Sequence, residues 1–197
     1  IKPKENAEPF HTRPFPVPRI HEFTFKSEFD RLCSLGVLKR VNRSQWRAPT
    51  FIIPKKDGTV RFISDFRELN KRIKRQPYPI PKIQDLLLRL EGFRYGKSLD
   101  LNTGYYHIAL SEKSKELCTI TTQWGKYEYQ QLPMGLRNSA DIFEEKMFTL
   151  LSGLETVRSK GTFEEHLKVL DNVFACLRQS GLKVNATKSN FGQHELD

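Results

Sequence analysis

The chain has 197 residues, 38% of them hydrophobic and 28% charged, a balance typical of one globular domain or of two small units that share a core. Its 33 Lys and Arg against 23 Asp and Glu give a net charge of +10, which suits a polyanionic partner such as nucleic acid, although a basic protein without one fits the charge equally well. Three widely spaced cysteines and the lack of a signal peptide or long apolar run argue against a metal-binding cysteine motif, a secreted disulfide scaffold and a membrane protein.

The first segment, residues 1–20, is rich in proline and is predicted to be an extended strap without a core of its own. It starts with Ile1 and not Met, which indicates a piece of a longer protein. A helix is expected over Thr24–Val37, where apolar side chains recur at helical spacing and Gly36 lies near the end. The expected buried face of this helix consists of Phe25, Phe29, Leu32 and Leu35.

A β-hairpin is predicted next, with strands at Thr50–Pro54 and Thr59–Ser64, because Asp57-Gly58 between two such runs is a strong turn signal. The cations that flank its tip are Lys55, Lys56 and Arg61. This arrangement suits a triphosphate, but a solvated charged turn would look the same. The densest basic stretch of the chain, Arg67–Arg75, follows; a phosphate backbone would account for it, and so would a solvated surface.

The rest of the chain combines helices with short strands. Helices are predicted at Pro81–Glu91, at about Ser139–Leu151 and from Thr162 to Gly181, where Thr162 and Glu165 have capping-box spacing. Strands are predicted at about 97–101, 105–110 and 117–122, with further short strands at 126–131, at 182–184 and around Phe191. Because hairpins and helices are segregated and do not alternate, the predicted fold class is α+β.

A lone carboxylate lies in the most informative segment, Leu99–Tyr106. Its leucine neighbours place Asp100 at the edge of a buried sheet, where a carboxylate is costly unless it is paired or bound to a metal. The alternative is that Asp100 caps the turn at Asn102–Gly104. No Asp-Asp pair occurs anywhere in the chain, so the further carboxylates that a nucleotide polymerase needs are missing from the sequence.

A Pro-x-Gly turn within Gln131–Leu136 leads into the helix at Ser139. Such a turn can bring the backbone close to a flat ligand such as a base pair, and a simple strand-to-helix connection is the alternative. The aromatic residues Trp124, Tyr127 and Tyr129 are predicted to pack on the sheet, and stacking on nucleic-acid bases is the alternative.

Taken in order, these segments resemble the fingers and palm of a gypsy-type LTR retrotransposon reverse transcriptase over nearly the whole chain. The matching segments are Trp46–Thr50, Pro54–Gly58, Arg61–Lys71, Pro77–Pro81, Leu99–Leu101, Gly104-Tyr105, Leu132–Leu136 and Glu164–Leu167. The resemblance implies an α+β fold in which an antiparallel palm sheet packs on helices. It divides the chain into a strap (1–20), fingers (21–95 and 112–138) and palm (96–111 and 139–197).

The resemblance also implies residue roles in two-metal phosphoryl transfer by an RNA-directed DNA polymerase. Asp100 matches the first catalytic carboxylate, which binds Mg²⁺ together with the backbone carbonyl of Leu101. The nucleotide-binding positions are Lys55, Arg61, Thr103, Gly104, Tyr105 and Met134, with Tyr105 as the gate against a ribose 2′-OH. The template-binding positions are Asp65, Arg67 and Gly135.

The partners that the resemblance implies are an RNA or DNA template-primer and a dNTP. It also places the chain in a larger pol polyprotein with protease, RNase H and integrase, located in a cytoplasmic virus-like particle or in the nucleus.

The sequence departs from this family where an aromatic-x-Asp-Asp hairpin is expected between the last two helices. Gly153–Arg158 runs directly into Ser159–Gly161, which corresponds to a gap of about eight to ten residues between intact flanks. One Asp cannot hold two Mg²⁺ ions, so we expect a rate loss of roughly a thousandfold or more and a chain that is inactive as written. Losing the hairpin also exposes apolar surface and unpaired strand edges of the palm.

Two alternatives to an inactive polymerase stay open. In one, residues of the natural protein are missing from this sequence. In the other, the chain is a non-catalytic, basic nucleic-acid-binding remnant.

Overall fold

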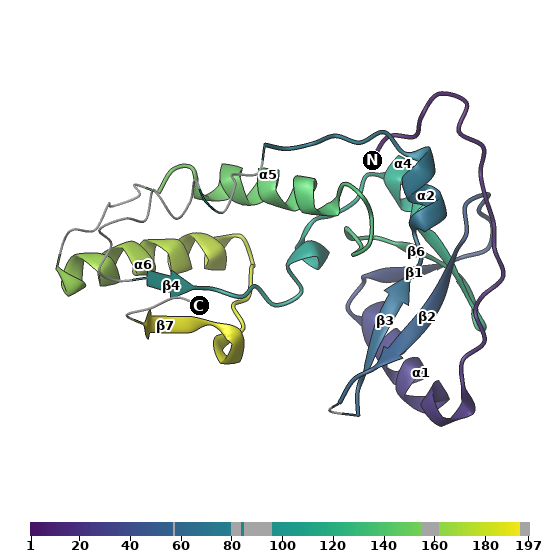
Figure 1. The fold of residues 1–197 in the computed structure, drawn as a ribbon, viewed down its shortest axis with the longest axis horizontal. Coiled ribbons are helices and arrows are strands. Elements are labelled where there is room, and N and C mark those ends of the chain that lie inside the picture. The colour runs from purple at the N-terminus through teal and green to yellow at the C-terminus, as the bar shows by residue number, and fades with distance from the viewer. Residues whose placement is uncertain (57, 80–83, 85–95, 155–161, 194–197) are drawn as a thin grey trace. The chain divides into compact units, whose positions relative to one another are not determined.

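The computed structural model describes residues 1–56, 58–79, 84, 96–154 and 162–193, and the chain divides into two compact units (Figure 1). The first unit contains Ile1–Gln76 and Ile108–Ala140, and the second contains Pro77–His107 and Asp141–Asp197. Each unit therefore combines two segments that are distant in the sequence. Within the described ranges, no helix is both long enough and apolar enough to cross a membrane.

The first unit is built on a five-stranded sheet in the order β1-β6-β5-β2-β3. The strands are β1 Leu38–Val41, β2 Ala48–Pro54, β3 Val60–Ser64, β5 Thr119–Thr122 and β6 Gly125–Tyr129. Neighbours in the sheet are antiparallel except β2 and β5, which run parallel. The predicted hairpin is confirmed as β2 and β3, and Gly58 in its turn has a φ of +77°, a conformation that favours glycine.

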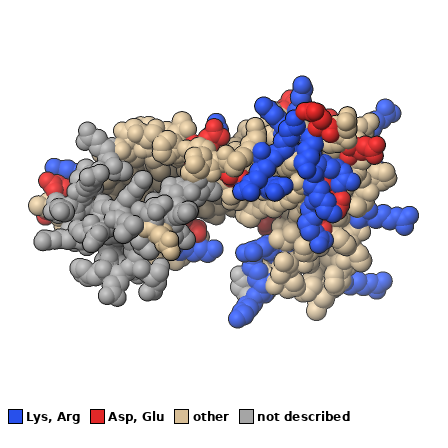
Figure 2. Space-filling model, turned by 45° about the horizontal axis from the view of Figure 1, so that its top comes forward, with Lys and Arg blue, Asp and Glu red and all other residues tan. Residues whose placement is uncertain are grey.

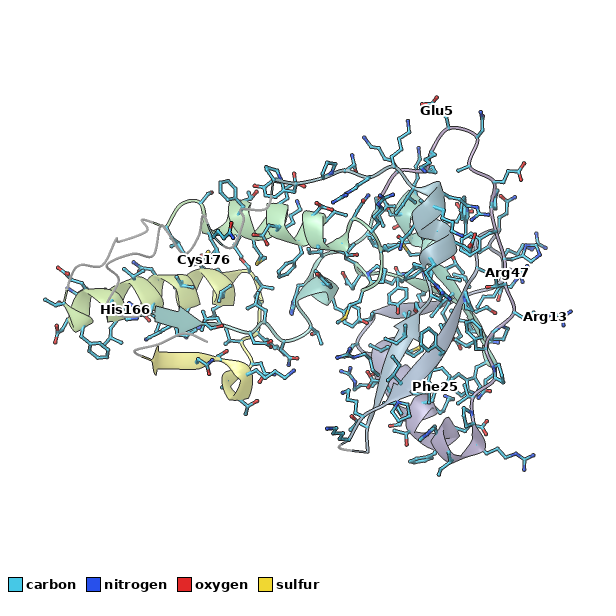
Figure 3. The ribbon with its side chains drawn as sticks, in the orientation of Figure 1. Glu5, Arg13, Phe25, Arg47, His166 and Cys176 are labelled. Carbon is cyan, nitrogen blue, oxygen red and sulfur yellow. The ribbon has the colours of Figure 1, made fainter. Side chains whose placement is uncertain are left out.

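Helix α1, Arg19–Ser34, lies against this sheet and contributes aromatic side chains to the core (Figure 1). Phe25 and Phe29 are buried, and Figure 3 shows Phe25 among the side chains between the helix and the strands. The Phe29 ring centre lies 5.1 Å from that of Trp124 and 4.6 Å from that of Tyr127. These contacts confirm that the aromatic residues of the sheet pack in the core.

The bounds of α1 differ from the prediction at both ends. The helix begins at Arg19 because Pro18, with a φ of −59°, ends the extended strap directly before it. It ends at Ser34, and Gly36 with a φ of +70° turns the chain. Leu35 therefore lies beyond the helix and is 60% exposed, so its placement on the buried face was wrong.

The strap is extended, as predicted, but one of its side chains joins the core of the first unit. Phe10 is buried and meets the ring of Trp46 edge-on at 5.9 Å. Backbone hydrogen bonds join the Arg47 N–H to the Phe10 carbonyl and the Thr12 N–H to the Arg47 carbonyl. A short helix that the sequence did not predict, α2 (Arg67–Arg72), lies in the basic stretch.

The strand predicted at 105–110 is wrong. Gly104–His107 forms a 3-10 helix, η1, because Thr103 adopts a φ of +52° and turns the chain. Within the predicted range, Ala109 forms an isolated antiparallel bridge with Gln131. Part of the next predicted strand is also helical, since α4 covers Glu112–Leu117 and β5 begins at Thr119.

Among its described residues, the second unit has a two-stranded antiparallel sheet and two long helices. Its elements are β4 Gly96–Ser98, η1, α5 Ser139–Leu151, α6 Phe163–Gln179, η2 Ala186–Lys188 and β7 Asn190–Gln193. The first two residues of α5 are assigned to the first unit. The bounds of α5 match the prediction. The capping box is confirmed, since Thr162 Oγ1 accepts the Glu165 N–H at 3.3 Å and the Thr162 N–H donates to Glu165 Oε2 at 3.0 Å.

Two further sets of predicted elements lie in the second unit. The helix predicted at Pro81–Glu91 falls outside the described residues, apart from Gln84. Of the strand predicted at 182–184, Val184 forms an isolated bridge with Leu101, while the strand around Phe191 is present as β7.

Candidate nucleotide and nucleic-acid site

Asp100 lies two residues beyond the end of β4, with its backbone held on both sides. Its N–H donates to Ser189 Oγ at 3.0 Å, and its carbonyl accepts the Asn185 N–H at 2.8 Å. The side chain is exposed, so the prediction that it sits at the edge of a buried sheet was wrong. The reason is that β4 is only three residues long and ends at Ser98, before the chain reaches Asp100.

The residues after Asp100 form a tight turn that leads into η1. Leu101 bridges Val184, and Thr103 has a left-handed φ that residues other than glycine rarely adopt. At Gly104, an added Cβ would lie only 3.0 Å from the ring of Phe143, so a larger residue there would require this ring to shift by a few tenths of an ångström. The Tyr105 ring meets the same Phe143 edge-on at 5.1 Å, which fixes its position.

Lys55 and Arg61 lie on the β2–β3 hairpin of the first unit. The Lys55 N–H donates to the Thr59 carbonyl at 2.8 Å, and Arg61 pairs with Ile53 in the strand register. Both side chains are exposed, and within the described part of the chain neither forms an ion pair. Their charges are therefore available to an anion.

Asp65 and Arg67 form an ion pair just after β3, with Arg67 Nη2 2.6 Å from Asp65 Oδ2 and Arg67 Nε 2.9 Å from Oδ1. Hydrogen bonding to the Arg67 guanidinium lowers the pKa of the Asp65 carboxyl below its ordinary value. Asp65 is largely buried, whereas the Arg67 side chain is 81% exposed. The acid thus holds the guanidinium in one orientation while leaving it open to solvent, beside a cavity of about 430 Å³ that also contacts Thr12 and Phe15.

Met134 and Gly135 lie on the loop before α5, and Asn70 holds that loop. Asn70 Nδ2 donates to the Gly135 carbonyl at 2.9 Å, and Asn70 Oδ1 accepts the Arg137 N–H at 2.7 Å. Gly135 has a φ of +87°, and Met134 is 52% exposed. Asn70 was missed as a site residue although it lies in the resembling segment Arg61–Lys71, because its partners Gly135 and Arg137 are distant in the chain.

The predicted site residues therefore fall into two groups, each gathered within its own unit. The first unit holds Lys55, Arg61, Asp65, Arg67, Met134 and Gly135, and the second holds Asp100, Leu101, Thr103, Gly104 and Tyr105.

A model of the family described as reverse transcriptase (RNA-dependent DNA polymerase) matches residues 53–197, and the chain belongs to this family. Among its relatives are an uncharacterized protein of Caenorhabditis elegans, 31% identical over 100% of this chain and 16% of the relative, and the retrovirus-related Pol polyprotein from transposon gypsy of Drosophila melanogaster, 28% identical over 96% of this chain and 20% of the relative. The chain thus spans a fifth or less of the length of these relatives.

Solved structures support the same assignment. The crystal structure of native prototype foamy virus protease-reverse transcriptase matches with a TM-score of 0.86 and 28% identity, over 95% of this chain and 26% of that chain. The foamy viral protein in complex with an RNA/DNA hybrid matches with a TM-score of 0.86 and 25% identity, over 97% and 27% of the two chains. The α+β fold with the fingers and palm architecture is thereby confirmed.

Reverse transcriptases are in general Mg²⁺-dependent. We therefore asked whether the carboxylates of this chain could bind Mg²⁺. Among residues 1–56, 58–79, 84, 96–154 and 162–193, no three His, Cys, Asp or Glu side chains come together as a metal-binding group. An exposed Asp100 with one neighbouring carbonyl offers too few oxygen ligands for two hard divalent ions. The described residues therefore do not fit a two-metal centre.

Proposed function

We propose that this chain is the fingers and palm portion of a retrotransposon reverse transcriptase that recognises a template-primer but does not add nucleotides as written. The first unit would supply most of the fingers and the second most of the palm, within a longer Pol polyprotein that acts in a cytoplasmic particle or the nucleus. Membership of the family supports the polymerase ancestry, and the foamy virus complex with an RNA/DNA hybrid supports the class of ligand.

The resemblance implies the residue roles, and the geometry of each unit supports them. Lys55 and Arg61 carry uncommitted charge on a hairpin and would hold a triphosphate. Arg67, oriented by Asp65, and the backbone of Gly135 would contact the template. Tyr105, fixed on Phe143, would lie against the sugar of an incoming nucleotide, together with Thr103, Gly104 and Met134.

The proposed loss of catalysis rests on one observation, which is that Asp100 is not part of a metal-binding group of side chains among the described residues. In the sequence no Asp-Asp pair exists, and the described residues supply no group of three potential ligands. Without further carboxylates, Asp100 and the Leu101 carbonyl cannot hold the metals that the reaction requires, and we expect a rate at least roughly a thousandfold below that of an intact enzyme.

The test is primer extension by the 197-residue chain on an RNA template with an annealed DNA primer, dNTPs and Mg²⁺. Asp100→Asn is the matched control, because it removes the remaining carboxylate with little change of shape. We expect the two proteins to give the same background. Extension by the original chain that Asp100→Asn abolishes would overturn the loss of catalysis.

Recognition of the template-primer is tested separately, by fluorescence anisotropy with a labelled RNA/DNA hybrid. We expect binding that weakens in Arg67→Gln, since this change removes an exposed guanidinium that Asp65 holds in place. Failure of the original chain to bind the hybrid at low salt would overturn the proposed function. The second candidate function, a basic nucleic-acid-binding remnant, predicts binding that is equal for hybrid and unrelated nucleic acids.

A further inference from the structure

The start of the strap pairs with the segment that follows α2, far from it in the sequence. Pro3 lies opposite Ile73 in an antiparallel bridge. The Lys4 N–H donates to the Arg72 carbonyl, and the Lys74 N–H donates to the Lys2 carbonyl, each at 2.8 Å. The strap is thus held in a fixed register against the last residue of α2 and the extended residues that follow it.

This register places four cations on one side of the pairing. Ile73 is fully buried, and the side chain of its neighbour Lys74 is 48% exposed. Arg72, the last residue of α2, is 30% exposed, and its guanidinium lies 5.1 Å from the centre of the Phe10 ring. Opposite positions of an antiparallel pair share a face, which brings Lys2 opposite Lys74 and Lys4 opposite Arg72. We call these four residues, Lys2, Lys4, Arg72 and Lys74, the basic ladder. Figure 2 shows Lys and Arg side chains gathered on one face of the first unit.

Like charges directly opposite each other destabilise a pairing, and the neighbouring acids offset this only in part. Lys74 pairs with Glu5 at 2.8 Å and Arg72 with Glu68 at 2.7 Å, but Glu5 is 89% exposed, so its ion pair is screened and weak. Within the described residues, Lys2 and Lys4 form no ion pair. A local arrangement that costs stability without an internal compensation is expected at a functional surface.

We infer that the basic ladder binds the phosphate backbone of a single nucleic-acid strand. Residues two apart in the extended strap are separated by about 6.8 Å and opposite residues by about 5.5 Å, so Lys2, Lys4 and Lys74 lie close enough together to contact neighbouring phosphates of one strand, with Arg72 beside them. Phosphates would relieve the repulsion between the cations and replace the exposed Glu5 as a counter-charge. The inference rests on the proposed function only in taking a polynucleotide as the ligand. None of the four residues is among the predicted nucleotide- or template-binding positions, although Arg72 and Lys74 lie in the basic stretch Arg67–Arg75.

The salt dependence of binding tests the ladder directly. The full chain is titrated with a labelled single-stranded oligouridylate across a range of NaCl concentrations. The ladder variant carries Lys2→Gln, Lys4→Gln and Lys74→Gln. Its matched control carries Lys39→Gln, Lys168→Gln and Lys183→Gln, three exposed lysines outside the ladder whose loss changes the net charge equally.

Each phosphate contact on a single strand contributes about 0.7 to the slope of log K against log salt, so the ladder variant is expected to lose about 2 from that slope. The control should keep the slope of the original chain. Both variants should unfold at or above the original temperature, because repulsive charges have been removed and no core contact is lost. Equal slopes for ladder variant and control would overturn the inference, and so would a ladder-dependent affinity for polyglutamate that matches the affinity for RNA.

The failure of this inference can be told apart from failure of the proposed function. Ladder-dependent binding of the single strand without binding of an RNA/DNA hybrid would overturn the proposed function alone. Hybrid binding that needs Arg67 but not the ladder, with single-strand binding unchanged in the ladder variant, would overturn the inference alone.

Discussion

The two units differ in how completely their apolar side chains are covered. In the described part of the first unit the core draws on the strap, α1, α2, α4 and every strand of the sheet. In the described part of the second unit the buried apolar side chains are Leu177 and Leu182, while Phe148, Phe163 and Leu167 are 65%, 45% and 42% exposed. Among the described residues, the first unit therefore has a large apolar core, whereas only these two apolar side chains of the second unit are buried. The apolar face of the amphipathic helix α6 is thus a surface suited to packing that the other described elements leave uncovered.

Deleting a ring from the filled core should have the largest effect. Phe29→Ala removes contacts with Phe62, Trp124 and Tyr127 and is expected to cost about 3–5 kcal/mol of unfolding free energy, whereas Leu167→Ala should cost less than about 1 kcal/mol. Both tryptophans of the chain, Trp46 and Trp124, lie in the first unit, so their fluorescence during urea unfolding reports that unit. Similar shifts of the fluorescence midpoint in the two variants would break the comparison.

Thiol modification compares the opening of the two units in one protein. Cys118 is fully buried in the first unit, and burial raises the pKa of its thiol above the ordinary value, while Cys176 is half-buried in the second. In a Cys33→Ser background, a difference in opening free energy of about 2 kcal/mol would make modification of Cys176 roughly 30-fold faster. Peptide mapping by mass spectrometry measures the two rates. In denaturant the two thiols should react at equal rates. Equal rates under native conditions would contradict a lower stability of the second unit.

The capping box at the start of α6 should give a smaller effect that is confined to the second unit. Thr162→Ala removes the oxygen that accepts the Glu165 N–H and is expected to destabilise the helix by about 1 kcal/mol. Far-UV circular dichroism should detect the change, while the tryptophan fluorescence transition stays in place. Thr162→Ser keeps the cap and serves as the control. A shift of the fluorescence transition by Thr162→Ala would show that the two units unfold together.

The ion pair of Asp65 and Arg67 should contribute least, less than about 1 kcal/mol, because Arg67 is 81% exposed. The folded-state pKa of Asp65 is lowered, so the pair stabilises the fold above the unfolded pKa of about 4, and this contribution is lost as the pH falls through the lower folded value. Asp65→Asn should therefore remove part of the loss of stability between pH 4 and pH 3, measured by urea unfolding. If the free energy of unfolding of Asp65→Asn falls between pH 4 and pH 3 as much as that of the original chain, other carboxylates cause the loss of stability.

Local signals in the sequence predicted local structure well. Asp57-Gly58 located the hairpin, and Thr162 with Glu165 located the start of α6, because both signals act through neighbouring backbone groups. The strand predicted at about 105–110 was wrong, since the positive φ of Thr103 turns the chain into the 3-10 helix η1 first. Helix α4 was missed because six residues are too few to show a helical period.

Features of the candidate site that depend on distant residues could not be predicted. The exposure of Asp100 is set by the short β4, and the orientation of the Gly135 loop is set by Asn70. The pairing of Lys2 with Lys74 joins residues at opposite ends of a long connection, and neither local sequence contains a signal for it. The residue types of the site were readable from the resemblance, whereas their burial and partners required the structure.

The parallel pairing of β2 with β5 sets the order in which the first unit is completed during synthesis. The β2–β3 hairpin can form as soon as both strands have left the ribosome, but β5 and β6 follow only after the segment Pro77–His107 of the second unit has been translated. Until then β2 has an open edge and the aromatic face of α1 lacks Trp124 and Tyr127. The rate of translation across residues 77–107 therefore determines how long this apolar surface is exposed to other nascent chains and to chaperones.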